Sequence, residues 1–199
     1  MEKRIDIESV FYQKVKNIIA DWKESGIYAI SFFVYSNEAY EYQGYRNVSE
    51  FLISYNTEQD CGQAGALDEK RWNYAFWRQD VHAIVDIYEG DEGADLLFKW
   101  YHQNNIKDIG FEDPDKMYDA DFRYTGRGPA GHYELITIAA NVANRLQRDG
   151  VIAKRFGKAI PIIVQGLEYT WFDIEATKKA NPGGEAETFL QYITKKEMA

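Results

Sequence analysis

One glycine-rich stretch has a spacing that could serve phosphate binding. Residues 126 to 131 read Gly-Arg-Gly-Pro-Ala-Gly and stand directly before a strongly apolar segment with helical periodicity. Free backbone amides at the start of a helix hold anions. The residues before this stretch, 117 to 125, are polar and acidic, whereas a dinucleotide fingerprint follows a buried strand in a βαβ unit. The pattern therefore favours a turn that leads into a helix, and dinucleotide binding is not expected.

A pocket for a small molecule or an anion near this loop stays open as an alternative function. Pockets of that kind combine apolar and aromatic walls with a few polar groups. We expect such a pocket, and the enzyme activity it would imply, to involve Trp77, Arg127, Gly128 and His132.

Acidic residues concentrate in the middle of the chain. Residues 86 to 121 hold eleven acidic residues and three lysines, whereas residues 122 to 158 hold seven basic and two acidic residues. A localised acidic face attracts a basic protein and speeds their encounter. The alternative is a solvated surface that the basic segment neutralises within the fold. We predict a face that binds a basic protein partner and includes Asp86, Asp108, Glu112, Asp113, Asp115, Asp119 and Asp121.

Part of this acidic segment could also bind a hard cation. Carboxylate oxygens of the kind that calcium prefers are offered by Asp113, Asp115, Asp119 and Asp121. The glycine and the glutamate that an EF-hand loop requires are replaced by Tyr118 and Tyr124. We therefore expect a solvated or partner-facing loop, with no metal and no cofactor.

The residues that could perform catalysis are few. The three histidines, His82, His102 and His132, match no metal-ligand spacing, and no serine follows Ser54. The single cysteine, Cys61, could act as a nucleophile with a distant histidine, but it lies in no local signature and is more simply a structural thiol. An enzyme is therefore the less favoured interpretation, and no catalytic residue is assigned.

Aromatic residues cluster between two arginines in the middle of the chain. The cluster comprises Trp72, Tyr74, Phe76 and Trp77, flanked by Arg71 and Arg78. Such side chains serve as interface anchors or stacking platforms. Large aromatic rings also dominate protein cores, and we expect these to fill the space between sheet and helices.

Composition limits the classes of protein that remain. A chain of 199 residues with 45% apolar residues can bury one core, so we expect a single domain over residues 1 to 199. The net charge of −9 argues against nucleic acid and anionic lipid as partners. One cysteine, and no apolar run long enough to span a membrane, favour a cytoplasmic protein. The oligomeric state is left open, and a structural or oligomeric subunit is a third possible role.

Hydrophobic periodicity predicts the elements that carry these residues. Apolar residues at helical spacing predict helices over residues 6 to 24, 69 to 88, 91 to 104, 132 to 148, 173 to 180 and 185 to 193. Apolar and aromatic runs predict strands over residues 27 to 35, 39 to 46, 51 to 55 and 160 to 164. Residues 105 to 131 are expected to form a long irregular connection. The order predicts an α+β fold, an antiparallel meander of three to five strands with the N-terminal helix and several C-terminal helices packed on it.

Four segments resemble a bacterial family known as domain of unknown function 4303. They are SYNTEQDC (54 to 61), EKRWNYAFW (69 to 77), FGKAIPIIVQGLEY (156 to 169) and ATKKANPGGEAETFLQY (176 to 192). The resemblance implies a small bacterial α+β domain without an established reaction, and it supplies no catalytic residues. Some small acidic bacterial domains are immunity proteins against secreted toxins. Analogy of size, charge and fold class therefore adds toxin neutralisation as a specific form of the protein-binding hypothesis.

Overall fold

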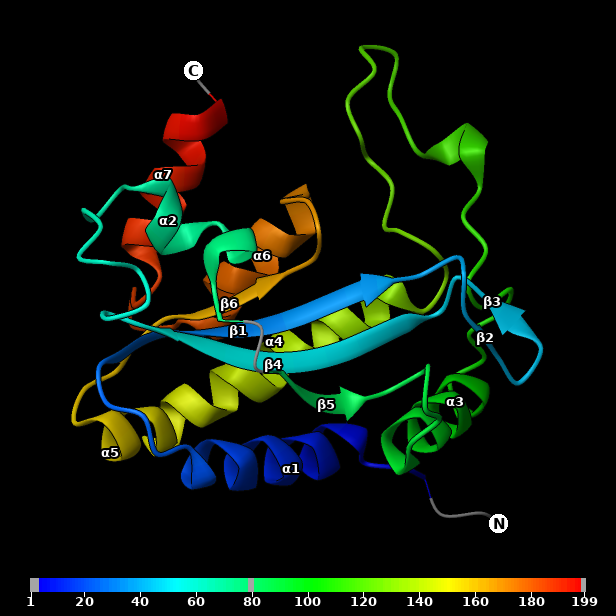
Figure 1. Cartoon of the computed structure of the whole chain (residues 1–199). Helices are drawn as coiled ribbons and strands as arrows, with labels where there is room; N and C mark the ends of the chain where they lie inside the picture. The colour runs from blue at the N-terminus through cyan, green and yellow to red at the C-terminus, as the bar shows by residue number, and fades with distance from the viewer. Residues whose placement is uncertain (1–3, 79–80, 198–199) are drawn as a thin grey trace.

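The computed structural model describes residues 4–78 and 81–197, which fold around one mixed sheet of four strands (Figure 1). The strand order is β5-β4-β1-β6. The central strand β1 (Ile27–Ser36) pairs antiparallel with β4 (Ser49–Thr57), and β5 (His82–Val85) continues the antiparallel pairing on β4. On its other side β1 pairs parallel with β6 (Ile162–Gln165). The described residues therefore have an α+β fold.

One face of the sheet is covered by an inner layer of helices, drawn below the sheet in Figure 1. This layer contains α1 (Ile7–Asp21), α3 (Glu92–Gln103), α4 (His132–Arg148) and α5 (Val151–Phe156). Alternate side chains of β1 point into it, so Ile30, Phe32 and Val34 are fully buried there. The inner layer holds the larger of the two apolar cores.

The opposite face carries a smaller and more polar core. It is covered by α2 (Glu69–Trp72), a 3₁₀ turn η1 (Tyr74–Phe76) and α7 (Glu187–Glu197), while α6 (Trp171–Ala180) packs against β6 and α4. Tyr28 on β1 meets the edge of the Trp72 ring and donates a hydrogen bond to the Arg71 carbonyl at 2.6 Å. The aromatic cluster therefore contributes mainly to this core, although Phe76 is exposed.

The helices predicted at both ends of the chain and at residues 91 to 104 and 132 to 148 are confirmed, with boundaries shifted by a few residues. The helix predicted over residues 69 to 88 forms only at its start, as α2, and residues 79 and 80 lie outside the described residues. Asn73 has an extended backbone that ends α2, and residues 82 to 85 pair as strand β5 with β4. The short helix α5, which follows Gly150 in a left-handed conformation, was not predicted.

The predicted antiparallel meander also needs correction. Residues 39 to 46 add no strand to the main sheet but form a separate hairpin of β2 (Glu41–Tyr42) and β3 (Tyr45–Arg46). Strand β4 therefore pairs directly with β1, and the edge strand β6 runs parallel to β1. Parallel neighbours place the carboxyl ends of β1 and β6 side by side, which positions the residues that follow them.

Candidate functional site

The long connection between α3 and α4 forms a loop that projects beyond the sheet (Figure 1, green). Its base is closed by two backbone hydrogen bonds, from Gly110 to the Ala130 carbonyl (2.9 Å) and from Ala130 to the Phe111 carbonyl (2.8 Å). An isolated bridge joins Tyr118 to Tyr124 farther out. We call residues 111–129 the projecting loop.

Most of the predicted partner-binding carboxylates lie on or beside this loop. Asp115, Asp119 and Asp121 are exposed, and Glu112 and Asp113 are half-buried. Asp108 is exposed just before the loop, whereas Asp86 lies in the turn after β5. The loop also carries Lys116, Arg123 and Arg127.

Several of these carboxylates shape the loop itself. An oxygen of Asp119 accepts the backbone amides of Asp121 and Arg123, each at 2.9 Å. Asp113 pairs with Lys116 at 2.8 Å, and this ammonium group lowers the pKa of the Asp113 carboxyl. These carboxylates are therefore held in place by hydrogen bonds and an ion pair within the loop. Among the described residues, no group of three or more histidine, cysteine or acidic side chains is arranged to hold a metal ion.

Large apolar side chains on the same loop face solvent. Phe122 is 87% exposed, Phe111 61% and Tyr118 54%. Across from the loop, Leu167 and Trp171 are exposed as well, and the Trp171 indole donates a hydrogen bond to the Gly126 carbonyl at 2.9 Å. Exposed aromatic groups gathered among carboxylates are typical of a protein interaction surface.

The glycine-rich stretch is closed by contacts within the protein. Backbone amides of the stretch donate to the Tyr124 hydroxyl (Gly128, 2.8 Å), the Met117 carbonyl (Gly126, 3.1 Å) and the Phe111 carbonyl (Ala130, 2.8 Å). These three amides are therefore already hydrogen-bonded within the protein. The Arg127 guanidinium also turns aside and lies over the Tyr133 ring, 4.6 Å from its centre.

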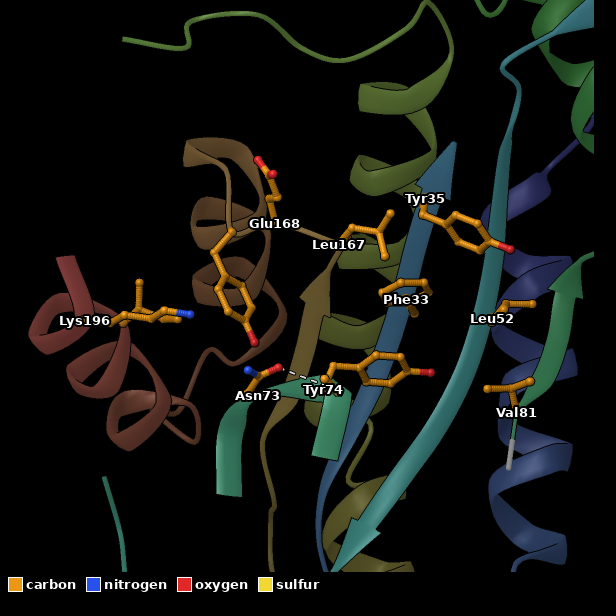
Figure 2. A pocket seen from close by; sticks show the side chains of 13 residues that line it. Phe33, Tyr35, Leu52, Asn73, Tyr74, Val81, Leu167, Glu168 and Lys196 are labelled. Atoms are coloured by element: carbon orange, nitrogen blue, oxygen red, sulfur yellow. Dashed lines mark hydrogen bonds between the residues drawn. The ribbon is translucent and has the colours of Figure 1, made fainter. Parts of the chain in front are cut away.

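Three adjoining cavities follow the carboxyl ends of β1 and β6. The largest, of about 1010 Å³, lies on the outer face of the sheet between Tyr74 and the residues after β6 (Figure 2). A second, of about 620 Å³, lies between the projecting loop and the start of α6. A third, of about 160 Å³, is lined by the end of β1, the residues after β6, His132 and Asp173. We call them the sheet cavity, the loop cavity and the inner cavity. Glu168 lines all three, so we treat them as one cleft.

The structure does not bring together all four residues that were predicted to line a pocket. Gly128 and His132 line the loop cavity, and His132 also lines the inner cavity. Trp77 is buried in the smaller core, where its indole donates to the Arg71 carbonyl at 2.9 Å. Arg127 lines none of the cavities.

Two buried titratable groups face the inner cavity. His132, the first residue of α4, accepts or donates one hydrogen bond at Nδ1 with the Ser49 hydroxyl (2.8 Å), and burial lowers its pKa to about 4. Asp173, in the first turn of α6, accepts hydrogen bonds from the Thr170 amide (2.9 Å) and hydroxyl (2.6 Å) at Oδ2. Burial nevertheless raises the pKa of Asp173 to about 7. At neutral pH the imidazole is thus uncharged and the carboxyl is close to half-protonated.

Sequence reasoning missed Asp173 and Glu168. The available signal was the spacing Thr170-x-x-Asp173, which predicts a capping box at the start of a helix. That signal explains the bonds of Oδ2 but not the burial of the carboxyl.

The remaining candidates for chemistry lie apart from the cleft. Cys61 is buried in the smaller core beside Glu58 and Arg71, which are joined by an ion pair. His82 and His102 are exposed, on β5 and α3. The structure gives neither histidine a contact with Cys61, so it does not assemble the nucleophile that the sequence left open.

No protein-family model, curated protein or solved structure matches the chain. The resemblance to domain of unknown function 4303 therefore stays a prediction. Within residues 4–78 and 81–197, no helix combines the length and apolar character needed to cross a bilayer.

Proposed function

We propose that the protein is a binding domain for a basic protein partner, and that the projecting loop makes the contact. The observation that carries this proposal is the placement of Phe111, Tyr118 and Phe122, exposed, on a loop bordered by carboxylates. Aromatic anchors supply interface affinity, and surrounding charge supplies specificity and a fast encounter. Neutralisation of a basic toxin is the specific form that size, charge and fold class favour.

The alternative function is a small-molecule site in the cleft. It is supported by the inner cavity, where a carboxyl with a pKa of about 7 and a neutral imidazole line the same space. Groups whose pKa values are moved apart by their surroundings are suited to proton transfer. The aspartates of the loop and the cleft can be tested separately. Asp113, Asp115, Asp119 and Asp121 line none of the three cavities, whereas other loop residues, Tyr118 and Phe122 among them, line the loop cavity.

Neutralising four carboxylates of the loop should weaken partner binding at least tenfold and flatten its salt dependence. The variant combines Asp113→Asn, Asp115→Asn, Asp119→Asn and Asp121→Asn. Asparagine keeps an oxygen that accepts the backbone amides in these turns, so the loop should keep its shape. The measurement is the amount of partner retained by the tagged protein from lysate of its source cells, at about 50 mM and about 500 mM salt.

A matched control removes the same number of charges elsewhere, with Asp21→Asn, Glu38→Gln, Glu175→Gln and Glu187→Gln. All four side chains are exposed away from the loop. The control should retain a basic polypeptide as well as the unaltered protein does. Equal retention by the loop variant and the control would contradict the proposed function.

A further inference from the structure

One carboxylate oxygen in the cleft has no partner. Asp173 is only 2% exposed, and its Oδ1 accepts no hydrogen bond from any described residue. Its other oxygen, Oδ2, already holds the two Thr170 donors. Asp173 also lines the inner cavity. A buried acceptor without a donor is costly, and its position beside a cavity points to a ligand that supplies the donor.

The charged side chains that line the cleft indicate the sign of the ligand's charge. The loop cavity and the inner cavity are lined by Glu112, Glu168 and Asp173, and by no lysine or arginine of the described chain. His132 adds no positive charge, because burial lowers its pKa to about 4. The side-chain charges in this part of the cleft therefore favour a cation over an anion.

Aromatic rings form much of the remaining wall of the loop cavity. Tyr124 meets the edges of the Tyr118 and Phe172 rings, with ring centres 5.7 and 6.4 Å apart. Phe122, Tyr169 and Trp171 also line the loop cavity. A planar cation gains from stacking on such rings and from several fixed donors, which an ammonium group does not offer.

We propose that the cleft between the projecting loop and α6 binds an arginine side chain, whose guanidinium passes Glu168 and donates to Oδ1 of Asp173. The arginine would belong to the basic partner, and in that respect the inference rests on the proposed function. Recognition of the guanidinium itself rests only on the cleft.

The state of Asp173 is consistent with this ligand. Burial raises the pKa of the carboxyl to about 7, which means that the surroundings of Asp173 destabilise its ionised form. A guanidinium at hydrogen-bond distance would favour the ionised form and satisfy Oδ1.

The test uses the full chain and two small probes. N-acetyl-arginine amide carries the guanidinium, and N-acetyl-citrulline amide has nearly the same shape without the charge. Isothermal titration at pH 8 should show saturable binding of the arginine probe, at least about tenfold tighter than that of the citrulline probe. Equal affinities, or no saturable binding of either probe, would overturn the inference.

Two substitutions locate the binding. Asp173→Asn should abolish the difference between the probes, and Glu168→Gln, an exposed change that leaves the fold intact, should weaken arginine binding several-fold. The variant with four neutralised loop aspartates should bind the arginine probe normally, since those residues do not line the cleft. If this variant loses the protein partner but still binds the arginine probe, the loss is due to the loop aspartates and not to the cleft. Unchanged arginine binding in Asp173→Asn would refute this site and leave the proposed function standing.

Discussion

Asp173→Asn should make the protein more stable than the unaltered chain at pH 8, by about 2 to 3 kcal/mol more than at pH 5. The reason is the direction of the pKa shift. The folded protein holds the Asp173 carboxyl at a pKa of about 7, whereas the ordinary value is 3.8. Between these two values the folded state binds more protons than the unfolded state, so its stability falls as the pH rises. Asparagine cannot ionise and removes this loss.

His132 acts in the opposite direction over an overlapping range. Its pKa of about 4 in the folded state lies below the ordinary 6.5, so the unfolded chain binds more protons between these values. This contribution destabilises the protein as the pH falls from about 6.5 to about 4. His132 is present in both proteins, so its contribution cancels when their free energies of unfolding are compared. The difference between Asp173→Asn and the unaltered protein therefore reports the ionisation of Asp173 alone.

The measurement is urea unfolding of both proteins at several pH values between 4 and 8.5. Asp21→Asn is the matched control, because Asp21 is exposed at the end of α1. The control should run parallel to the unaltered protein across the range. A difference between Asp173→Asn and the unaltered protein that stays constant with pH would show that Asp173 ionises normally in the fold.

A gain in stability at Asp173 would also bear on function. A buried group that destabilises the fold is retained where a binding or catalytic role requires it. If Asp173 has the proposed binding role, one substitution should have both effects. Asp173→Asn should be more stable than the unaltered protein at pH 8 and should not distinguish the arginine probe from the citrulline probe.

Gly110→Ala should destabilise the protein by about 2 kcal/mol or more and displace the projecting loop. Gly110 has a φ of +81°, and a Cβ added there would lie 1.8 Å from the Arg46 carbonyl oxygen. The same residue closes the base of the loop through its amide to the Ala130 carbonyl, and its own carbonyl accepts from the Asn47 side chain at 3.3 Å. A methyl group therefore forces apart the hairpin of β2 and β3 and the base of the loop.

Gly44→Ala is the control that distinguishes the steric clash at Gly110 from the cost of a left-handed backbone. Gly44 has a similar φ of +84°, but a Cβ there meets no atom within 4 Å. Its substitution should cost only about 1 kcal/mol, the penalty of a left-handed alanine. Thermal and urea unfolding compare the two variants. Equal losses would mean that the loop base is not packed as closely as described.

The sequence predicts helices and strands well where the pattern of apolar residues along a single segment is clear. The apolar face of α4 and the continuous apolar run of β1 are both read from neighbouring residues, and both are confirmed. The aromatic segment from Trp72 to Trp77 has no clean period, because its rings pack on a core built by β1 and α7, which are distant in the sequence. The parallel pairing of β6 with β1 is set by the same kind of distant contact.

The candidate sites also contain features that neighbouring residues predict and features that depend on distant contacts. The acidic loop was visible as a run of charges, but the exposure of Phe122 between them depends on how the loop leaves the sheet. Asp173 could be assigned only a capping role from its spacing to Thr170. Its unpartnered oxygen lies at the inner cavity, which is lined by residues of β1, of α4 and of the segment after β6. These segments are distant in the sequence, so no local pattern records that they meet.

Site-specific photo-crosslinking from position 122 tests the central claim most directly. A benzophenone amino acid replaces Phe122 in one protein and Phe76 in a second, since Phe76 is also exposed but lies in η1, outside the loop. After illumination of source cells, position 122 should give one dominant adduct with a basic polypeptide. Position 76 should not give it, and the four loop aspartate-to-asparagine changes should abolish it. Absence of an adduct at position 122, or the same adducts at both positions, would contradict the proposal that the projecting loop binds a basic partner.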